Sequence, residues 1–157
     1  MRVHHDQLEL RTNGKGLYEI TDDVQSKIDR SGVRNGTVTV FVQHTSCSIV
    51  IMENADRTAR DDLEEFFNRL VPEDADYFRH GSEGSDDMPS HIRMVLTRTS
   101  ETGPIALPIN RLDEPQRFLG RQKRLLHLVH DVRKCDFVLW IGKCVAAPGA
   151  GMSEGSS

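Results

Sequence analysis

The order of apolar and polar residues predicts a chain that alternates between strands and helices. Period-two alternation and β-branched runs are typical of strands. Six segments carry such a pattern: 3–12, 17–20, 37–43, 47–52, 102–109 and 137–142. The sequence Asn-Gly-Lys-Gly at 13–16 separates the first two segments. Because these residues favour tight turns, the first two strands are predicted to be joined by a hairpin-like turn.

Helical spacing replaces alternation after the second strand. Thr21 and two aspartates after it offer an N-cap and an acidic first turn. Val24 and Ile28 then lie four residues apart on one helical face, and Gly32 is suited to a C-cap. A first helix is therefore predicted to run from about residue 21 to Gly32.

A longer amphipathic helix is predicted from Asp56 to about Val71. Its apolar residues recur at helical spacing at Leu63, Phe66, Phe67 and Leu70. The two phenylalanines are interpreted as core residues, and Pro72 ends the helix.

A further helix is predicted to start near Asp87, which can cap it, with Pro89 in the first turn. Its apolar face would consist of Ile92, Val95 and Leu96. The polar segment 73–87 before it contains Tyr77-Phe78-Arg79-His80 and is predicted to be a long loop that packs against the domain.

At 157 residues the chain is predicted to form one domain, which would cover residues 1–145. Residues 146–157 are rich in Ala, Gly, Ser and Pro and are predicted to be a disordered tail.

Composition narrows the possible partners and location. Hydrophobic residues make up 37% of the 157 residues and charged residues 28%, which is typical of a soluble globular chain. The net charge is -4 and the basic residues are dispersed, so no nucleic-acid partner is expected. The chain begins without a signal-like apolar core and contains no apolar run of roughly 20 residues, so no membrane partner and a cytoplasmic location are expected.

The cysteines give little indication of chemistry. There are three, Cys47, Cys135 and Cys144, and no CxxC pair. Neither a disulfide framework nor a zinc knuckle is predicted. Cys47 follows His44 by three residues, so a Cys/His nucleophile pair is an alternative. On a strand the two side chains would point to opposite faces, which argues against it.

The histidines are the main candidates for chemistry. Four of the seven occur in polar settings: His44, His80, His91 and His130. No pair has the local spacing of a metal motif, so the fold would have to assemble any site. Three imidazoles with an open water position form a known catalytic zinc arrangement. The alternative is that each histidine is simply exposed or hydrogen-bonded, and that His44-Thr45-Ser46 forms a polar turn.

A succession of motifs makes the sequence similar to one family. The motifs are His44-Thr45-Ser46, Glu53-Asn54-Ala55-Asp56, Asn68-Arg69-Leu70-Val71-Pro72, Tyr77-Phe78-Arg79-His80 and Asp86-Asp87-Met88-Pro89-Ser90-His91-Ile92. Their order resembles the YjbQ family, whose members are described as secondary thiamine-phosphate synthases. The resemblance covers roughly residues 5–145.

The resemblance implies a compact α+β fold with a mixed or antiparallel sheet and two to three helices, assembled as a homotrimer. It also implies a histidine-lined site that binds a divalent metal ion, with zinc the leading choice. The implied metal ligands are His44, His91 and His130. The implied catalytic residues are Ser46, Glu53, Asn54, Asp56, His80 and Asp87. The implied reaction couples a pyrimidine diphosphate to a thiazole phosphate, with the metal as Lewis acid.

The sequence departs from the family pattern near its end. Arg121-Gln122-Lys123 stands where the family has Thr-Trp-Gln, and Val129 and Asp131 flank His130 in place of Glu and Arg. This predicts a low or altered activity on a small molecule, for which a phosphorylated compound is one candidate. Two alternatives stay open: a metal-dependent hydrolase of a phosphorylated compound, and a trimer that binds metal or ligand without catalysis.

Overall fold

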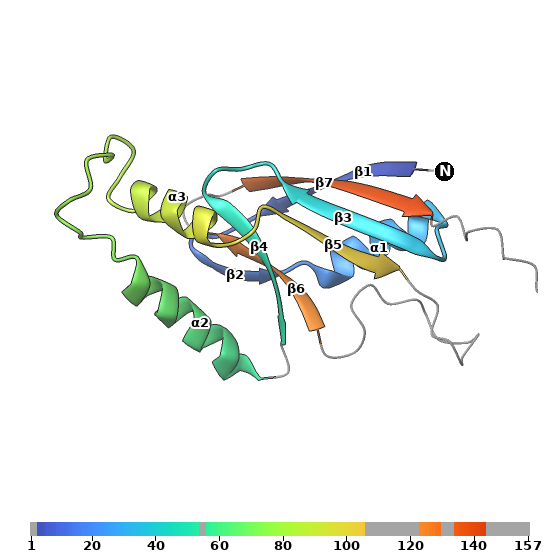
Figure 1. Ribbon diagram of the computed structural model, residues 1–157, viewed down its shortest axis with the longest axis horizontal. Helices are drawn as coiled ribbons and strands as arrows, with labels where there is room; N and C mark the ends of the chain where they lie inside the picture. Colours follow the sequence, from blue (N-terminus) through green and yellow to red (C-terminus); the bar gives the residue numbers. More distant parts are fainter. Residues whose placement is uncertain (1–2, 54–55, 106–122, 130–133, 144–157) are drawn as a thin grey trace, which may run out of the picture.

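The computed structural model describes residues 3–53, 56–105, 123–129 and 134–143 of the chain (Figure 1). Three helices occur in these ranges: α1 (Thr21–Ser31), α2 (Arg57–Leu70) and α3 (Asp87–Leu96). The strands there are β1 (Val3–Arg11), β2 (Gly16–Glu19), β3 (Gly36–Val42), β4 (Cys47–Glu53), β5 (Ser100–Ile105), β6 (Lys123–Val129) and β7 (Lys134–Lys143). The predicted α+β class is confirmed.

The strands form two antiparallel sheets. One sheet has the order β1-β7-β3-β5, and the other has the order β2-β6-β4. In the larger sheet Val40 lies opposite Leu139 of β7 and opposite Glu101 of β5. The sheets approach each other where β4 meets the chain before β5, and a single bridge joins Ile49 to Arg98 there.

The main core lies on one face of the larger sheet. Alternation along β3 buries Val38, Val40 and Val42 on that face. Val24 and Ile28 of α1 pack into the same cluster and have no exposed surface. The period-two and helical patterns therefore meet in one core, as expected for apolar faces that need a common partner.

The predicted hairpin between the first two strands is wrong. β1 pairs with β7, and β2 pairs with β6, so the two strands belong to different sheets. Gly14 and Gly16, with φ of 122° and 153°, allow the chain to change sheet at this turn. Turn chemistry fixes a local reversal, whereas the pairing depends on distant strands.

The N-cap of the first helix lies one residue earlier than predicted. Ile20 occupies the N-cap position without a side-chain hydrogen bond, and Thr21 is inside the helix. The predicted C-cap is confirmed, since Gly32 is left-handed with φ of 68° and donates its N–H to the Asp29 carbonyl.

The apolar faces of α2 and α3 are partly corrected. Phe67 is buried with Leu17, whereas Phe66 is 57% exposed. On α3 the predicted apolar face is reversed: Val95 and Leu96 are exposed, 74% and 55% respectively. The buried side of α3 consists of Asp87, Pro89, Ser90 and Arg93.

Several predictions fall outside the described residues. They concern His130, residues 106–109 of the strand predicted at 102–109, and the tail 146–157, so the domain boundary at residue 145 stays a prediction. In the described part of the chain, no helix combines the length and the apolarity needed to cross a membrane.

The packing of α1 can be tested by making the same Val→Ala substitution at a buried and at an exposed position. Val24 is fully buried, whereas Val3 at the start of β1 is 51% exposed. We expect Val24→Ala to lower the free energy of unfolding by about 1–3 kcal/mol, because two buried methyl groups are lost. Val3→Ala should change it by less than about 0.5 kcal/mol. Urea unfolding measures both, and equal losses would contradict the placement of α1.

Candidate metal site

One cluster of metal-ligating side chains lies where α3 begins. It consists of His80, Asp87 and His91, whose potential ligand atoms all lie within 4.8 Å of one another. Asp87 and His91 are one helical turn apart on α3, so their side chains share a face. His80 comes from the segment that connects α2 to α3, which brings it back to the start of the helix (Figure 1).

Asp87 is the centre of the cluster. Its side chain is 6% exposed, whereas those of His80 and His91 are 50% and 30% exposed. His80 Nε2 lies 2.9 Å from one carboxylate oxygen, Oδ2, and His91 Nε2 lies 3.4 Å from the other, Oδ1. The two imidazole centroids are 5.7 Å apart. The cluster therefore places two imidazoles on either side of one buried carboxylate.

The tautomer of His91 follows from its second contact. His91 Nδ1 lies 2.9 Å from the Thr45 carbonyl oxygen. A carbonyl oxygen only accepts, so Nδ1 must carry the proton and donate. In the neutral ring Nε2 then has a lone pair, and this nitrogen lies 3.4 Å from Asp87 Oδ1. A neutral imidazole cannot donate to the carboxylate from this position.

The other oxygen of Asp87 is also poorly satisfied. Oδ2 is buried and accepts no hydrogen bond from the described residues. His80 Nε2 lies 2.9 Å from this oxygen but forms no hydrogen bond with it. A buried carboxylate oxygen without a donor is unfavourable. A cation between the carboxylate and the two imidazoles would satisfy all three groups.

The His44-Thr45-Ser46 segment contacts this cluster through its backbone. Thr45 supplies the carbonyl that fixes the His91 ring. His44 Nδ1 accepts the Ser46 backbone N–H at 3.0 Å, so that nitrogen is already used in a local turn. Ser46 is 4% exposed. The predicted grouping of His44 with His91 is therefore not the grouping that the described residues form.

The remaining predicted site residues separate into two groups. Asp56 is the N-cap of α2, where its Oδ1 accepts the Thr58 backbone N–H at 2.8 Å. This contact is the main reason that the pKa of Asp56 lies below its ordinary value, and a hydrogen bond with the Thr58 hydroxyl lowers it further. Slight desolvation opposes both. The side chain of Glu53 lies outside what the structure describes, as do Asn54 and His130.

A buried arginine supports the segment that carries His80. Arg93 on α3 is 2% exposed and donates from Nη2 to the Val71 carbonyl at 2.7 Å. Its Nη1 lies 3.9 Å from Glu73, which also accepts from Lys15 at 2.6 Å. Desolvation lowers the pKa of Arg93, and Glu73 opposes that shift. The start of the segment after α2 is thus fixed to α3 and to the turn before β2.

The fold and this cluster define a small α+β protein with a candidate His/Asp metal site. The chain belongs to the YjbQ family: the family model described as UPF0047 protein YjbQ-like matches residues 6–117. The UPF0047 protein of Synechocystis sp. is 50% identical over 104 residues, covering 66% of this chain and 71% of the relative. The UPF0047 protein YjbQ of Escherichia coli O157:H7 is 38% identical over 105 residues, covering 66% and 72%.

Solved structures show the same fold. A YjbQ/UPF0047 family protein from Clostridium acetobutylicum has a TM-score of 0.73 at 26% identity, covering 87% of this chain and 99% of that one. A YbjQ-like protein of unknown function from Sulfolobus solfataricus has a TM-score of 0.75 at 18% identity, covering 89% and 96%. At 18% identity, the likeness to the Sulfolobus protein shows a shared fold alone.

These comparisons correct the expected activity. The family description and the relatives' names carry no reaction, and the Sulfolobus protein is described as being of unknown function. The thiamine-phosphate synthase activity that the resemblance implied is therefore wrong as a function for this chain. The family membership that the motifs predicted is confirmed.

The capping role of Asp56 predicts a pH dependence. Because its pKa is lowered in the folded chain, the cap stabilises α2 above the ordinary carboxyl pKa and loses this effect as pH falls through the lowered value. We expect Asp56→Asn to keep a cap but to remove this acid-dependent part of the stability. Urea midpoints near neutral pH and at about pH 3 measure the difference. Asp62→Asn, at an exposed position of α2, is the control, and equal pH dependence in wild type and Asp56→Asn would contradict the cap.

Proposed function

We propose that the protein binds one divalent metal ion through His80, Asp87 and His91. The observation that supports this most is the His91 ring, whose Nδ1–H is committed to the Thr45 carbonyl while its Nε2 lone pair faces a buried carboxylate. Two electron-rich groups that face each other need a cation between them. The Thr45 contact is also the kind that orients metal-bound histidines.

The donor set indicates the kind of ion. Two imidazoles and one carboxylate are used by catalytic zinc sites and by iron(II) sites with open positions. Donor atoms around a zinc ion at about 2.0–2.1 Å lie closer together than the 4.8 Å limit of this cluster. Binding would therefore draw the ligands together, and the half-exposed His80 is the group that can move. We place zinc first among the candidates.

Three protein ligands leave at least one coordination position for water or a small molecule. The exposed side of His80 gives that position access from solvent. A phosphorylated small molecule as the occupant stays a prediction, as does the cytoplasmic location. The proposal is one of metal binding.

The metal site is tested by titrating zinc into metal-free protein and measuring bound ion per chain. We expect about one ion per chain, and a roughly 100-fold or larger loss of affinity in Asp87→Asn and in His91→Gln. Asn keeps the shape of Asp87 and removes its charge. His5→Ala, at an exposed position of β1, is the matched control and should bind as the wild type does.

One further variant separates the two possible ligand sets. His44→Ala should keep the ion, because His44 Nδ1 is used by the Ser46 N–H and His44 is not part of the cluster. Loss of zinc in His44→Ala with retention in His80→Ala would contradict the set proposed here. Wild-type protein that takes up no zinc, manganese or iron(II) would overturn the metal site itself.

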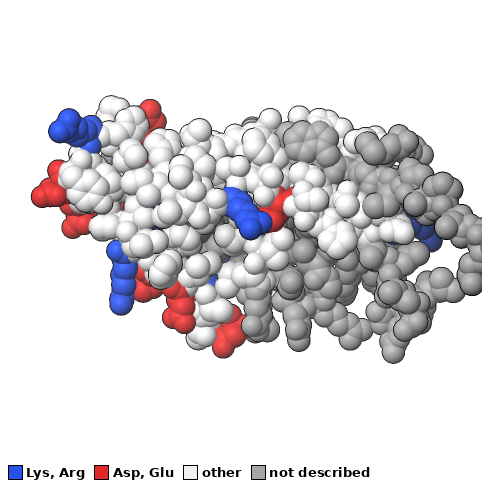
Figure 2. Space-filling model, in the orientation of Figure 1, with Lys and Arg blue, Asp and Glu red and all other residues white. Residues whose placement is uncertain are grey.

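We also propose that the chain assembles as a homotrimer, the state implied by the family resemblance. What supports association is exposed apolar surface on the two helices at one end of the molecule: Phe66, Leu70, Val95 and Leu96 are each more than half exposed. Figure 2 shows charged side chains of both signs toward that end and a broad uncharged area beside them. Phe66 and Leu70 lie four residues apart on one face of α2, and exposed apolar patches are typical of association surfaces.

Light scattering after size-exclusion chromatography tests the assembly. The wild type should have three times the chain mass of 17.7 kDa. Phe66→Glu and Leu70→Glu place a charge on the exposed face of α2 and should yield monomers. Ser26→Glu adds the same charge to an exposed position of α1 and should stay trimeric. A monomeric wild type would contradict the proposal.

A further inference from the structure

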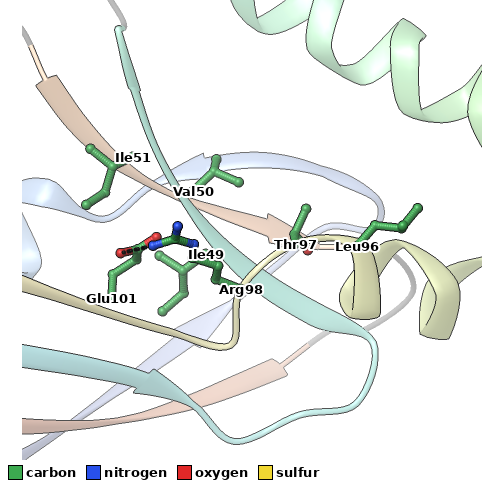
Figure 3. Close-up of a pocket in the computed structure, with 7 residues that line it drawn as sticks. All are labelled: Ile49, Val50, Ile51, Leu96, Thr97, Arg98 and Glu101. Atoms are coloured by element: carbon green, nitrogen blue, oxygen red, sulfur yellow. Dashed lines mark hydrogen bonds and ion pairs between the residues drawn. The ribbon is translucent and has the colours of Figure 1, made fainter.

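A pocket of about 540 Å³ lies between β4 and β5, away from the histidine cluster (Figure 3). The two strands belong to different sheets and are bridged at Ile49 and Arg98, where the Ile49 N–H donates to the Arg98 carbonyl at 2.6 Å. From this bridge the strands diverge, and the pocket fills the space between them. Its size is within the range of small-molecule sites, about 300–1,000 Å³.

The floor of the pocket holds a carboxylate where the strand pattern calls for an apolar residue. Alternation along β5 places Glu101 on the same face as Gly103 and Ile105, which are buried. Glu101 lies opposite Val40 in the sheet, and its side chain is only 12% exposed. A carboxylate in this position costs desolvation, so the residue points to a role other than packing.

The partner of this carboxylate is the exposed side chain of Arg98. Arg98 Nη1 lies 3.4 Å from Glu101 Oε2, and the Arg98 side chain is 74% exposed. Figure 3 shows the two side chains facing each other beside Ile49. A long ion pair to an exposed arginine contributes little to stability, so a ligand can open it easily. The opened pair offers one positive and one negative group side by side.

The rest of the pocket lining consists of aliphatic side chains and of backbone groups at the edge of β4. Ile51 packs against the core cluster that contains Ile49. In Figure 3 it lies on the side of β4 nearer to Glu101, whereas Val50 points the other way. Because the Ile49 N–H points to the free edge of β4, strand alternation turns the Ile51 N–H and C=O to that edge as well. These groups add one donor and one acceptor to the charged pair.

We propose that this pocket binds a small zwitterion of the α-amino acid class with an aliphatic side chain. The ligand carboxylate pairs with Arg98, its ammonium pairs with Glu101, and its side chain lies against Ile51. One long ion pair is replaced by two, and each charge of the ligand meets its opposite. The site is independent of the metal site and stands whether or not the protein binds a metal ion.

Calorimetric titration of the full chain with L-leucine tests the proposal. We expect saturable binding of one molecule per chain, with Kd raised about tenfold or more in Arg98→Gln and in Glu101→Gln. Arg69→Gln is the matched control: it breaks an exposed ion pair to Glu65 on α2 and should leave Kd unchanged. Far-UV circular dichroism checks that Glu101→Gln is folded, and the exposed Arg98 provides the variant that does not depend on core packing.

Two leucine analogues test the chemical class. Isoamylamine lacks the carboxylate and 4-methylpentanoate lacks the ammonium group, so each should bind about tenfold or more weakly than leucine. Equal binding of leucine and either analogue would overturn the zwitterion assignment. No saturable binding of leucine up to about 10 mM, or equal Kd in Arg98→Gln and wild type, would overturn the site. Asp87→Asn should bind leucine as the wild type does, which separates this result from failure of the metal site.

Discussion

The burial of the Asp87 carboxylate is the constraint on which the histidine cluster depends. A carboxylate that is 4% exposed as a residue must be compensated by charge or by hydrogen bonds. The chain places two imidazoles from separate segments beside it, His80 before α3 and His91 within it, and a cation shared by all three groups would compensate the charge. A third segment, the turn after β3, fixes the ring of His91 through the Thr45 carbonyl. One buried charge therefore holds together parts of the chain that are far apart in sequence.

The same constraint explains why α3 has its polar side inward. Ser90 is 1% exposed and donates its hydroxyl to the Asp86 carbonyl, so it is satisfied within its own helix. Arg93 is 2% exposed and donates to the Val71 carbonyl, which fixes the end of α2. Its Nε finds no acceptor among the described residues, and desolvation lowers its pKa. These polar contacts hold the connecting segment near α3, at the cost of leaving apolar residues such as Val95 outside.

Local patterns predicted the elements well and the assembly poorly. The strand at 137–142 and the C-cap at Gly32 follow from short-range rules, and the structure confirms both. The pairing of β1 with β7 is non-local, so turn chemistry at Gly14 could not reveal it. For the candidate site, the four-residue spacing of Asp87 and His91 was a usable signal. The position of His80 beside Asp87 depends on the conformation of the whole segment after α2, and no periodicity in the sequence predicts it.

A proton could compete with a metal ion at this cluster, and the geometry distinguishes the two. Protonated His91 would donate from Nε2 to Asp87 Oδ1, yet the separation is 3.4 Å, longer than the roughly 2.7–2.9 Å of a charge-assisted hydrogen bond. It would also leave Oδ2 without a hydrogen-bond donor, because His80 Nε2 lies 2.9 Å away but forms no hydrogen bond with it. A metal ion has no such directional requirement on the side of the carboxylate, and it can accept both imidazole lone pairs at once. The arrangement therefore favours a shared cation over two separate proton-mediated pairs.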